Sequence, residues 1–204
     1  MKKILLATAA MTLVACGGTD DAADDVGIDD ETANEVEMYD RFDRDVNDDA
    51  ALMSATYPVI NSAGSEIGTV TISDVEGSGV TVSLDVTAIP EGQRAIHFHE
   101  TGSCDTPDFQ SAGGHYNPSN ANHGFEADDP NPHAGDMENF DAPASGVVRT
   151  EIGNDRVTLS DREGLAPLLD ANGTALIIHA GADDYETQPS GDAGSRIACA
   201  VIEP

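Results

Sequence analysis

The sequence predicts an all-β domain: an eight-stranded antiparallel Greek-key sandwich or barrel with long loops. Two observations point to this fold class. The 204 residues include 20 Gly and 10 Pro, and the many Val, Ile and Thr suit short strands joined by turns better than helices. From about Met53 onward, short β-rich runs recur with Gly-containing turns between them, which is typical of sandwiches and barrels.

Eight runs account for the predicted strands. They cover residues 56–60, 66–73, 80–88, 94–100, 146–152, 156–160, 174–179 and 196–202. The first three are separated by turns that contain Gly64 and Gly77, and this spacing predicts an antiparallel meander. The stretch 101–144 is rich in Gly, Pro, Asn and Asp and has almost no strand pattern. Because loops of that length in a compact domain are usually functional, we expect functional residues in it.

The first 15 residues are predicted to be a signal peptide. Lys2 and Lys3 form a positive start, and residues 4–15 are apolar but too few to span a membrane. The stretch ends in Leu-Val-Ala-Cys-Gly, which resembles the bacterial lipoprotein cleavage box, so Cys16 is predicted to carry lipid. The alternative is a plain signal peptide followed by a chance cysteine. Lipidation would anchor the protein in the cell envelope or periplasm, and Gly17 favours the outer membrane.

Residues 16–49 are predicted to be the lipidated Cys16 and an acidic disordered tether. Residues 19–49 hold fourteen acidic residues and two Arg, with few apolar residues and no sustained period. Such a segment cannot bury enough surface to offset its ordering entropy. The folded domain is therefore expected to cover residues 50–204.

The charge of the chain excludes nucleic acid as a partner. Thirty-eight acidic residues against nine basic ones give a formal net charge of −29, which repels a phosphate backbone. Trp is absent and aromatic residues make up 4% of the chain, so few side chains are available to stack on nucleic-acid bases.

Three cysteines are present. If Cys16 carries lipid, Cys104 and Cys199 remain to form a disulfide in an oxidising compartment. That bridge would close a loop of about 95 residues, worth roughly 4–5 kcal/mol in the chain-entropy model. Two free thiols are the alternative, and they are uncommon in an exported protein.

Histidines carry the chemical signal. The six are His97, His99, His115, His123, His133 and His179. Since His97 and His99 lie two apart in a predicted strand, their rings leave one face while Phe98 points to the core. Imidazoles from a strand and a loop form a nitrogen-rich site suited to copper or zinc. Asp136, three residues after His133, can complete a tetrahedral zinc set. One such His alone would more often be a surface or hydrogen-bonding residue, but six clustered among glycines indicate a metal site.

The motifs around these histidines resemble the copper–zinc superoxide dismutase family, in its exported bacterial lipoprotein form. The matching segments are HFHE at 97–100, AGGHYNP at 112–118, HG at 123–124, HAGD at 133–136, HAGADD at 179–184 and GSRIAC at 194–199. The resemblance covers residues 54–202 in one consistent order. It implies dismutation of superoxide to dioxygen and hydrogen peroxide by a redox-cycling copper next to a structural zinc, as an antioxidant function.

The resemblance also implies two ligand sets that share one histidine. Copper would be held by His97, His99, His115 and His179. Zinc would be held by His115, His123, His133 and Asp136.

Further roles follow from the same resemblance. His115 would bridge the metals and take part in proton transfer, and Arg196 would attract the superoxide anion. Asp183 would link a copper histidine to a zinc histidine. Cys104 and Cys199 match the family disulfide, in agreement with the cysteine count.

The chain departs from the family pattern at three positions. Ala95 and Ala200 stand where relatives often carry Gly, and only repacking is expected there. Glu186 stands where relatives often carry Lys, which argues against rapid electrostatic steering.

Two other functions would use the same residues. One is a lipoprotein that buffers or delivers copper or zinc without turnover, and the presence of Arg196 argues against it. The other is an acidic surface or adhesion module, which the complete set of histidines argues against. Either protein, like the enzyme, could form a homodimer.

Overall fold

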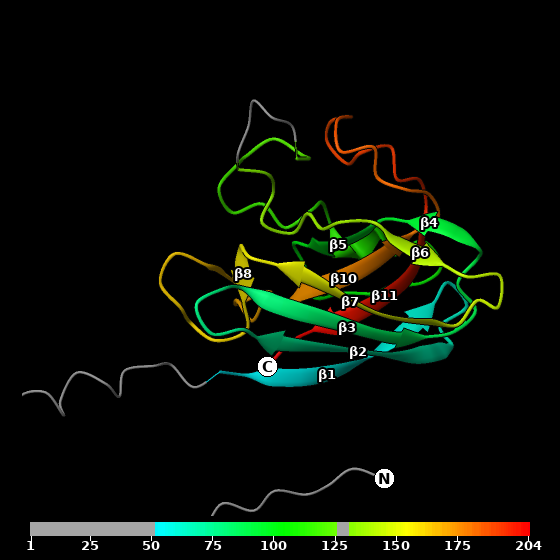
Figure 1. Cartoon of the computed structure of the whole chain (residues 1–204), viewed down its shortest axis with the longest axis horizontal. Coiled ribbons are helices and arrows are strands. Elements are labelled where there is room, and N and C mark those ends of the chain that lie inside the picture. Colours follow the sequence, from blue (N-terminus) through cyan, green and yellow to red (C-terminus); the bar gives the residue numbers. More distant parts are fainter. Residues whose placement is uncertain (1–51, 126–130) are drawn as a thin grey trace, which may run out of the picture. The chain divides into compact units, whose positions relative to one another are not determined.

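A computed structural model describes residues 52–125 and 131–204, and it has the all-β fold that the sequence predicts (Figure 1). The predicted signal peptide, the predicted lipid site at Cys16 and the whole predicted tether lie outside the described residues. Over the part of the chain that is described, no helix is long and apolar enough to cross a membrane.

Seven strands form one curled antiparallel sheet, in the order β5-β10-β11-β1-β2-β3-β7 (Figure 1). Their bounds are β1 Ser54–Asn61, β2 Glu66–Asp74, β3 Val80–Val86, β5 Ile96–His99, β7 Val148–Asn154, β10 Thr174–His179 and β11 Arg196–Ile202. Strands β1, β2 and β3 follow each other directly and form the predicted meander. β10 and β11 are also consecutive neighbours, whereas the pairs β11 with β1, β5 with β10 and β3 with β7 join strands that are far apart in the sequence, as a Greek-key arrangement requires.

Four very short strands complete the fold. β4 (Gly92–Arg94) pairs with β6 (Phe140–Ala142), and β8 (Val157–Thr158) pairs in parallel with β9 (Ala166–Pro167). The predicted run 94–100 is therefore divided at Ala95 between β4 and β5, and the run 156–160 contains only the two residues of β8.

The long stretch after β5 is not wholly irregular. It contains β6 and a 3-10 turn over Gln110–Ala112, which the sequence pattern did not indicate. These pieces of two or three residues are too short to show a periodic pattern, and their pairing partners are remote in the sequence.

Alternation along β10 distributes side chains between two apolar clusters. Leu176 and Ile178 belong to the main core inside the curled sheet. Ala175 and Ile177 point the other way, into a smaller cluster with Phe109 from the loop after β5. Because both faces of the strand are covered, every residue of β10 is buried.

β5 is the strand that positions the candidate site. Ile96 and Phe98 are fully buried in the main core, which confirms the predicted alternation and leaves His97 and His99 on the opposite face. One edge of β5 pairs with β10. The other edge pairs with loop residues, through isolated bridges from His97 to Asp136 and from His99 to His115.

Candidate metal centre

The six histidines and Asp136 form two adjoining groups of donor atoms. The first group is His97, His99, His115 and His179, and the second is His115, His123, His133 and Asp136. Within each group the donor atoms lie within 4.8 Å of one another, and every member is buried. His115 belongs to both groups. The structure thus brings together all the residues that the sequence indicated as metal ligands.

Backbone carbonyls orient two rings of the first group. His99 Nδ1 lies 3.0 Å from the carbonyl oxygen of Gly113, and His179 Nδ1 lies 3.2 Å from that of Gly194. Since a neutral imidazole that donates from Nδ1 presents its lone pair at Nε2, both rings offer Nε2 to the centre of the group.

A shared carboxylate orients one ring in each group. Asp183 Oδ2 lies 2.7 Å from His97 Nε2, and Asp183 Oδ1 lies 3.0 Å from His123 Nε2. The Nδ1 atoms of both rings are left to face the donor groups. Despite burial, hydrogen bonds from His123 and His97 hold the pKa of Asp183 below its usual range, so this carboxylate is ionised and accepts both bonds. Carboxylates of this kind fix the tautomer and orientation of metal-binding histidines.

In the second group, three imidazole nitrogens converge on one carboxylate. Asp136 Oδ1 lies 2.8 Å from His115 Nδ1 and 3.3 Å from His133 Nδ1. Asp136 Oδ2 lies 3.0 Å from His123 Nδ1. Burial would raise the pKa of Asp136, but hydrogen bonds from the histidines keep it far below its usual range. Three imidazoles and one ionised carboxylate are a donor set that zinc accepts.

Unpartnered nitrogens show that both groups fit a metal ion. Among the described residues, the buried side-chain nitrogen and oxygen atoms without a hydrogen-bond partner all belong to these histidines. They are His97 Nδ1, His99 Nε2, His115 Nε2, His123 Nδ1, His133 Nδ1 and His179 Nε2. Of these, His123 Nδ1 and His133 Nδ1 are close to the Asp136 carboxylate but not aligned for a hydrogen bond to it, whereas the other four have no polar contact of their own. Leaving a buried polar group unpaired costs about 1–3 kcal/mol. Six such atoms directed at two points are therefore explained by ligands, and nitrogen-rich sets suit copper and zinc.

Three of these rings, His99, His115 and His179, are neutral at pH 7. Burial lowers the pKa of His115 to about 4 and that of His179 to about 3. Burial also holds the pKa of His99 well below its ordinary value. Neutral rings have the free lone pair that a metal ligand needs.

His123 differs from these three rings. Burial acts to lower its pKa, but hydrogen bonds to Asp136 and Asp183 outweigh burial and raise the pKa to about 9. In the metal-free chain, the proton on His123 supplies positive charge between two carboxylates.

Arg196 lines a cavity of about 740 Å³ that opens onto the first group. His99, His115 and His179 line the same cavity. The guanidinium of Arg196 is held by two donated hydrogen bonds, each 2.6 Å long, to the carbonyl oxygens of Phe109 and Gly113. Since Gly113 also accepts from His99, the charged group and this imidazole share one anchor. The arrangement places a fixed cation beside the donor atoms, where it can bind a small anion.

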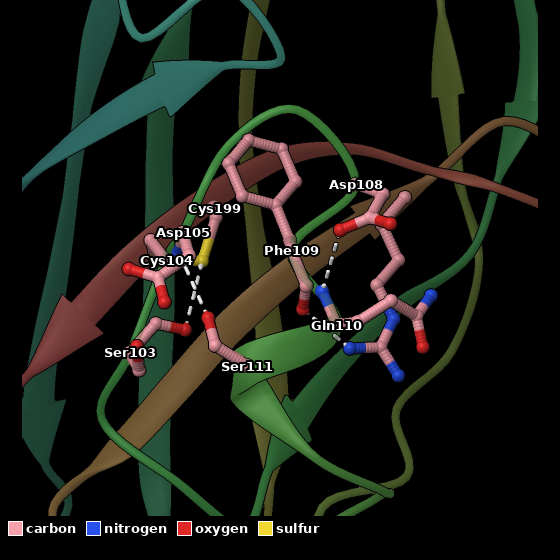
Figure 2. The surroundings of a disulfide bond; sticks show 9 residues. Ser103, Cys104, Asp105, Asp108, Phe109, Gln110, Ser111 and Cys199 are labelled. Carbon is pink, nitrogen blue, oxygen red and sulfur yellow. Dashed lines mark hydrogen bonds between the residues drawn. A yellow bond between two sulfur atoms is a disulfide. The ribbon is translucent and has the colours of Figure 1, made fainter.

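A disulfide joins Cys104 to Cys199, as the cysteine count predicts (Figure 2). It links the loop after β5 to β11, and the ring of Phe109 packs beside it in the smaller apolar cluster. The same loop segment supplies the carbonyl oxygens that hold Arg196. The disulfide therefore supports the cation at the cavity.

Several supporting residues carried no sequence signal. Asn139 Oδ1 accepts a hydrogen bond from the backbone N–H of Asp183 at 2.8 Å. The backbone N–H of Asn139 donates to the Tyr185 hydroxyl at 2.8 Å. Gln188 pairs with both backbone groups of His123, each bond 2.8 Å long. These amides connect loops that are more than 40 residues apart. No local motif marks such contacts.

Comparison with known proteins gives one consistent answer. A sequence model of the family described as copper/zinc superoxide dismutase matches residues 66–202. The chain is 42% identical over 146 residues to a Cu-Zn superoxide dismutase of Aquifex aeolicus, covering 71% of this chain and 85% of that protein. It is 41% identical over 151 residues to a Cu-Zn superoxide dismutase of Caulobacter vibrioides, covering 74% and 86%. A solved double mutant of a SOD-like protein from Bacillus subtilis superposes with a TM-score of 0.69 at 37% identity, covering 73% of this chain and 97% of that one.

Proposed function

The chain belongs to the copper/zinc superoxide dismutase family, and from that premise we propose that its two donor groups carry out superoxide dismutation with the residue roles given below. The reaction converts two superoxide anions and two protons into dioxygen and hydrogen peroxide. The cofactors of the family are copper and zinc. The observation that carries the proposal is the set of six buried imidazole nitrogens that make no aligned hydrogen bond and lie in two adjoining donor groups.

The donor groups suit different ions. We assign copper to His97, His99, His115 and His179, because four imidazoles form a nitrogen-only set beside the cavity. We assign zinc to His115, His123, His133 and Asp136, because this set includes a carboxylate. Copper, when bound, supplies the one-electron redox chemistry, and zinc supplies charge without redox chemistry.

Arg196 binds the substrate anion in this proposal. Its guanidinium is fixed at the cavity by Phe109 and Gly113, so little side-chain freedom is lost when an anion arrives. A fixed cation beside a redox site concentrates superoxide where the electron transfer takes place.

His115 handles the proton. Its Nε2 faces the copper group and its Nδ1 faces the zinc group. Since the ring also lines the cavity, Nε2 would take a proton from water when it is not bound to copper and would give that proton to the reduced substrate. Asp183 holds the rings of His97 and His123 in place during the cycle.

The test combines metal content and turnover on one purified sample. We expect both copper and zinc in the protein, superoxide consumption that is lost on chelation, and recovery that requires copper. Recovery with zinc alone would contradict the redox role of copper. Bound metal without superoxide consumption would indicate a metal carrier instead.

We also propose that the protein is an exported, membrane-anchored lipoprotein of the cell envelope. The support is the positive start, the short apolar stretch and Cys16 in a lipoprotein-type cleavage box. The disulfide between Cys104 and Cys199 supports export too, since such bonds persist in oxidising compartments.

Cys16→Ser tests the anchor. We expect the unaltered protein to fractionate with membranes and to incorporate labelled fatty acid, and the variant to lose both properties while its dismutase activity persists. Label incorporation by the variant would contradict lipidation at Cys16.

A further inference from the structure

The four-residue turn that carries two zinc-group ligands, His133 to Asp136, has all of its backbone carbonyls hydrogen-bonded. Gly135 O accepts from Phe98 N at 2.9 Å, and His133 O accepts from Asp136 N at 3.2 Å. Two side chains from the end of β7 and the residues after it satisfy the rest. Asn154 Nδ2 donates to Ala134 O at 2.9 Å and to Asp136 O at 3.3 Å. Arg156 donates to His133 O at 3.3 Å and to Asp136 O at 2.5 Å.

Arg156 also contacts the earlier part of the zinc-group loop. Its guanidinium lies 5.3 Å from the centre of the Phe125 ring, two residues after His123. Phe125 in turn packs against Tyr185, with 5.4 Å between ring centres. One side chain therefore touches segments that carry three of the four zinc-group ligands.

We propose that Asn154 and Arg156 form a carbonyl clamp that positions the zinc-group ligands, with Arg156 as a positioning residue that sets the affinity for zinc. This inference rests on the zinc assignment proposed above. The donor atoms of His133 and Asp136 converge only if the turn between them keeps its shape. The clamp holds the backbone carbonyls of that turn, whereas zinc would bind its side chains, so folding orders the turn without the metal. Outer partners of metal ligands are worth about 10–100-fold in affinity.

The charge of Arg156 and its hydrogen bonds predict opposite effects on zinc affinity, so a substitution distinguishes the two. A guanidinium near a cation site repels the cation, and its neighbour Asp155 offsets this only in part, with 73% of the Asp155 side chain exposed. If charge alone mattered, a neutral residue at this position would bind zinc more tightly. If the clamp positions the turn, the same residue would bind zinc more weakly.

The experiment measures the zinc dissociation constant of the copper-free, disulfide-intact chain by competition with a chromophoric chelator. Arg156→Gln is expected to weaken zinc binding about tenfold. The matched control is Arg149→Gln, which removes the same charge from an exposed pair with Asp85 on the face of β7 and should leave zinc affinity unchanged. Cobalt placed in the zinc group provides a second measure, and its visible absorption should change in Arg156→Gln but not in the control.

Unchanged or tighter zinc binding in Arg156→Gln would overturn the clamp, even if the variant melts at a lower temperature. Should Arg156→Gln fail to fold, Arg156→Lys keeps the charge but lacks the forked guanidinium that donates to the two carbonyls from different nitrogens, and unchanged zinc affinity in it would overturn the inference equally. His133→Ala separates the clamp from the zinc assignment. Normal zinc binding in His133→Ala would refute the assignment, whereas loss of zinc there with normal binding in Arg156→Gln would refute only the clamp.

Discussion

Each ring nitrogen of His115 belongs to a different donor group. Its Nδ1 lies 2.8 Å from Asp136, and its Nε2 is buried and unpartnered on the copper side. His179, by contrast, reaches only the copper group and is anchored to the Gly194 carbonyl. The two histidines therefore differ in how many metals depend on them.

His115→Ala should weaken both metals, whereas His179→Ala should weaken copper and spare zinc. Loss of a direct ligand is expected to exceed the roughly 10–100-fold effect of an outer partner. Copper and zinc content after dialysis, together with separate titrations of each metal, would measure this. Normal zinc affinity in His115→Ala would show that the ring does not serve the zinc group.

At the scale of elements, Asp74 ties the end of β2 to the segment that follows β8. Its carboxylate is buried and accepts five hydrogen bonds, which come from Met53 N, Thr158 Oγ1, Leu159 N, Ser160 N and Ser160 Oγ. Burial alone would raise the pKa of Asp74, but the bonds from Ser160, Leu159 and Met53 lower it below its ordinary value. The ionised carboxylate therefore stabilises the junction of two elements.

Asp74→Asn should destabilise the fold by roughly 2–3 kcal/mol at neutral pH, because an amide offers hydrogens where the carboxylate accepts them. The pKa of Asp74 is lower in the folded chain than in the unfolded chain, so its contribution is complete above the unfolded value and is lost as the pH falls through the folded value. The difference in unfolding free energy between the unaltered protein and Asp74→Asn (the stability gap) should thus narrow below about pH 4. Urea unfolding at several pH values measures the gap, and Asp85→Asn, on an exposed carboxylate, is the control. A gap that does not depend on pH would contradict the role of the ionised form.

The disulfide acts at the same scale, because it joins the loop after β5 to β11. Reduction should remove roughly 4–5 kcal/mol in the chain-entropy model, which corresponds to a fall of about 10 °C or more in melting temperature. Metal retention should fall as well, since this loop continues into His115. Calorimetry with and without verified reduction measures both effects. Equal melting temperatures would show that the bond contributes no stability.

Elements with a strong pattern could be predicted to the residue, and contacts between elements could not. β10 and β11 have the predicted bounds, 174–179 and 196–202, because each is a continuous apolar run with a turn before it. The histidines and Arg196 could be named because they stand in local motifs. Asp74, Asn154 and Arg156 could not, since their partners lie from 18 to 86 residues away and become neighbours only in the folded chain.

At the scale of the whole molecule, charge opposes the substrate. Residues 50–204 contain 24 acidic residues and five Arg, a formal charge of −19. Three of the other arginines donate to backbone carbonyls and the fourth pairs with Asp85, which leaves Arg196 as the cation at the cavity. The distant field repels superoxide, and the local field attracts it.

The rate of dismutation should therefore stay flat or rise with moderate ionic strength. Salt screens distant charges first, since the Debye length is about 8 Å at 0.15 M. Arg196→Glu should lower the rate well beyond Arg196→Ala, because alanine only removes the positive charge whereas glutamate replaces it with a negative one. Pulse radiolysis at fixed pH across a salt series measures both. A steep fall of the rate with salt would show net attractive steering and contradict this charge argument.

The carboxylate of Asp183 holds one histidine from each donor group, so we expect the two metal occupancies to be coupled. Asp183 contacts His97 and His123 at the same time, so a change in the position of one ring on metal binding would be transmitted to the other. Linkage requires the effect to be reciprocal: zinc changes the affinity for copper by the same factor as copper changes the affinity for zinc. The order in which the ions bind then depends on their supply, and the ion that binds first changes the affinity of the other donor group.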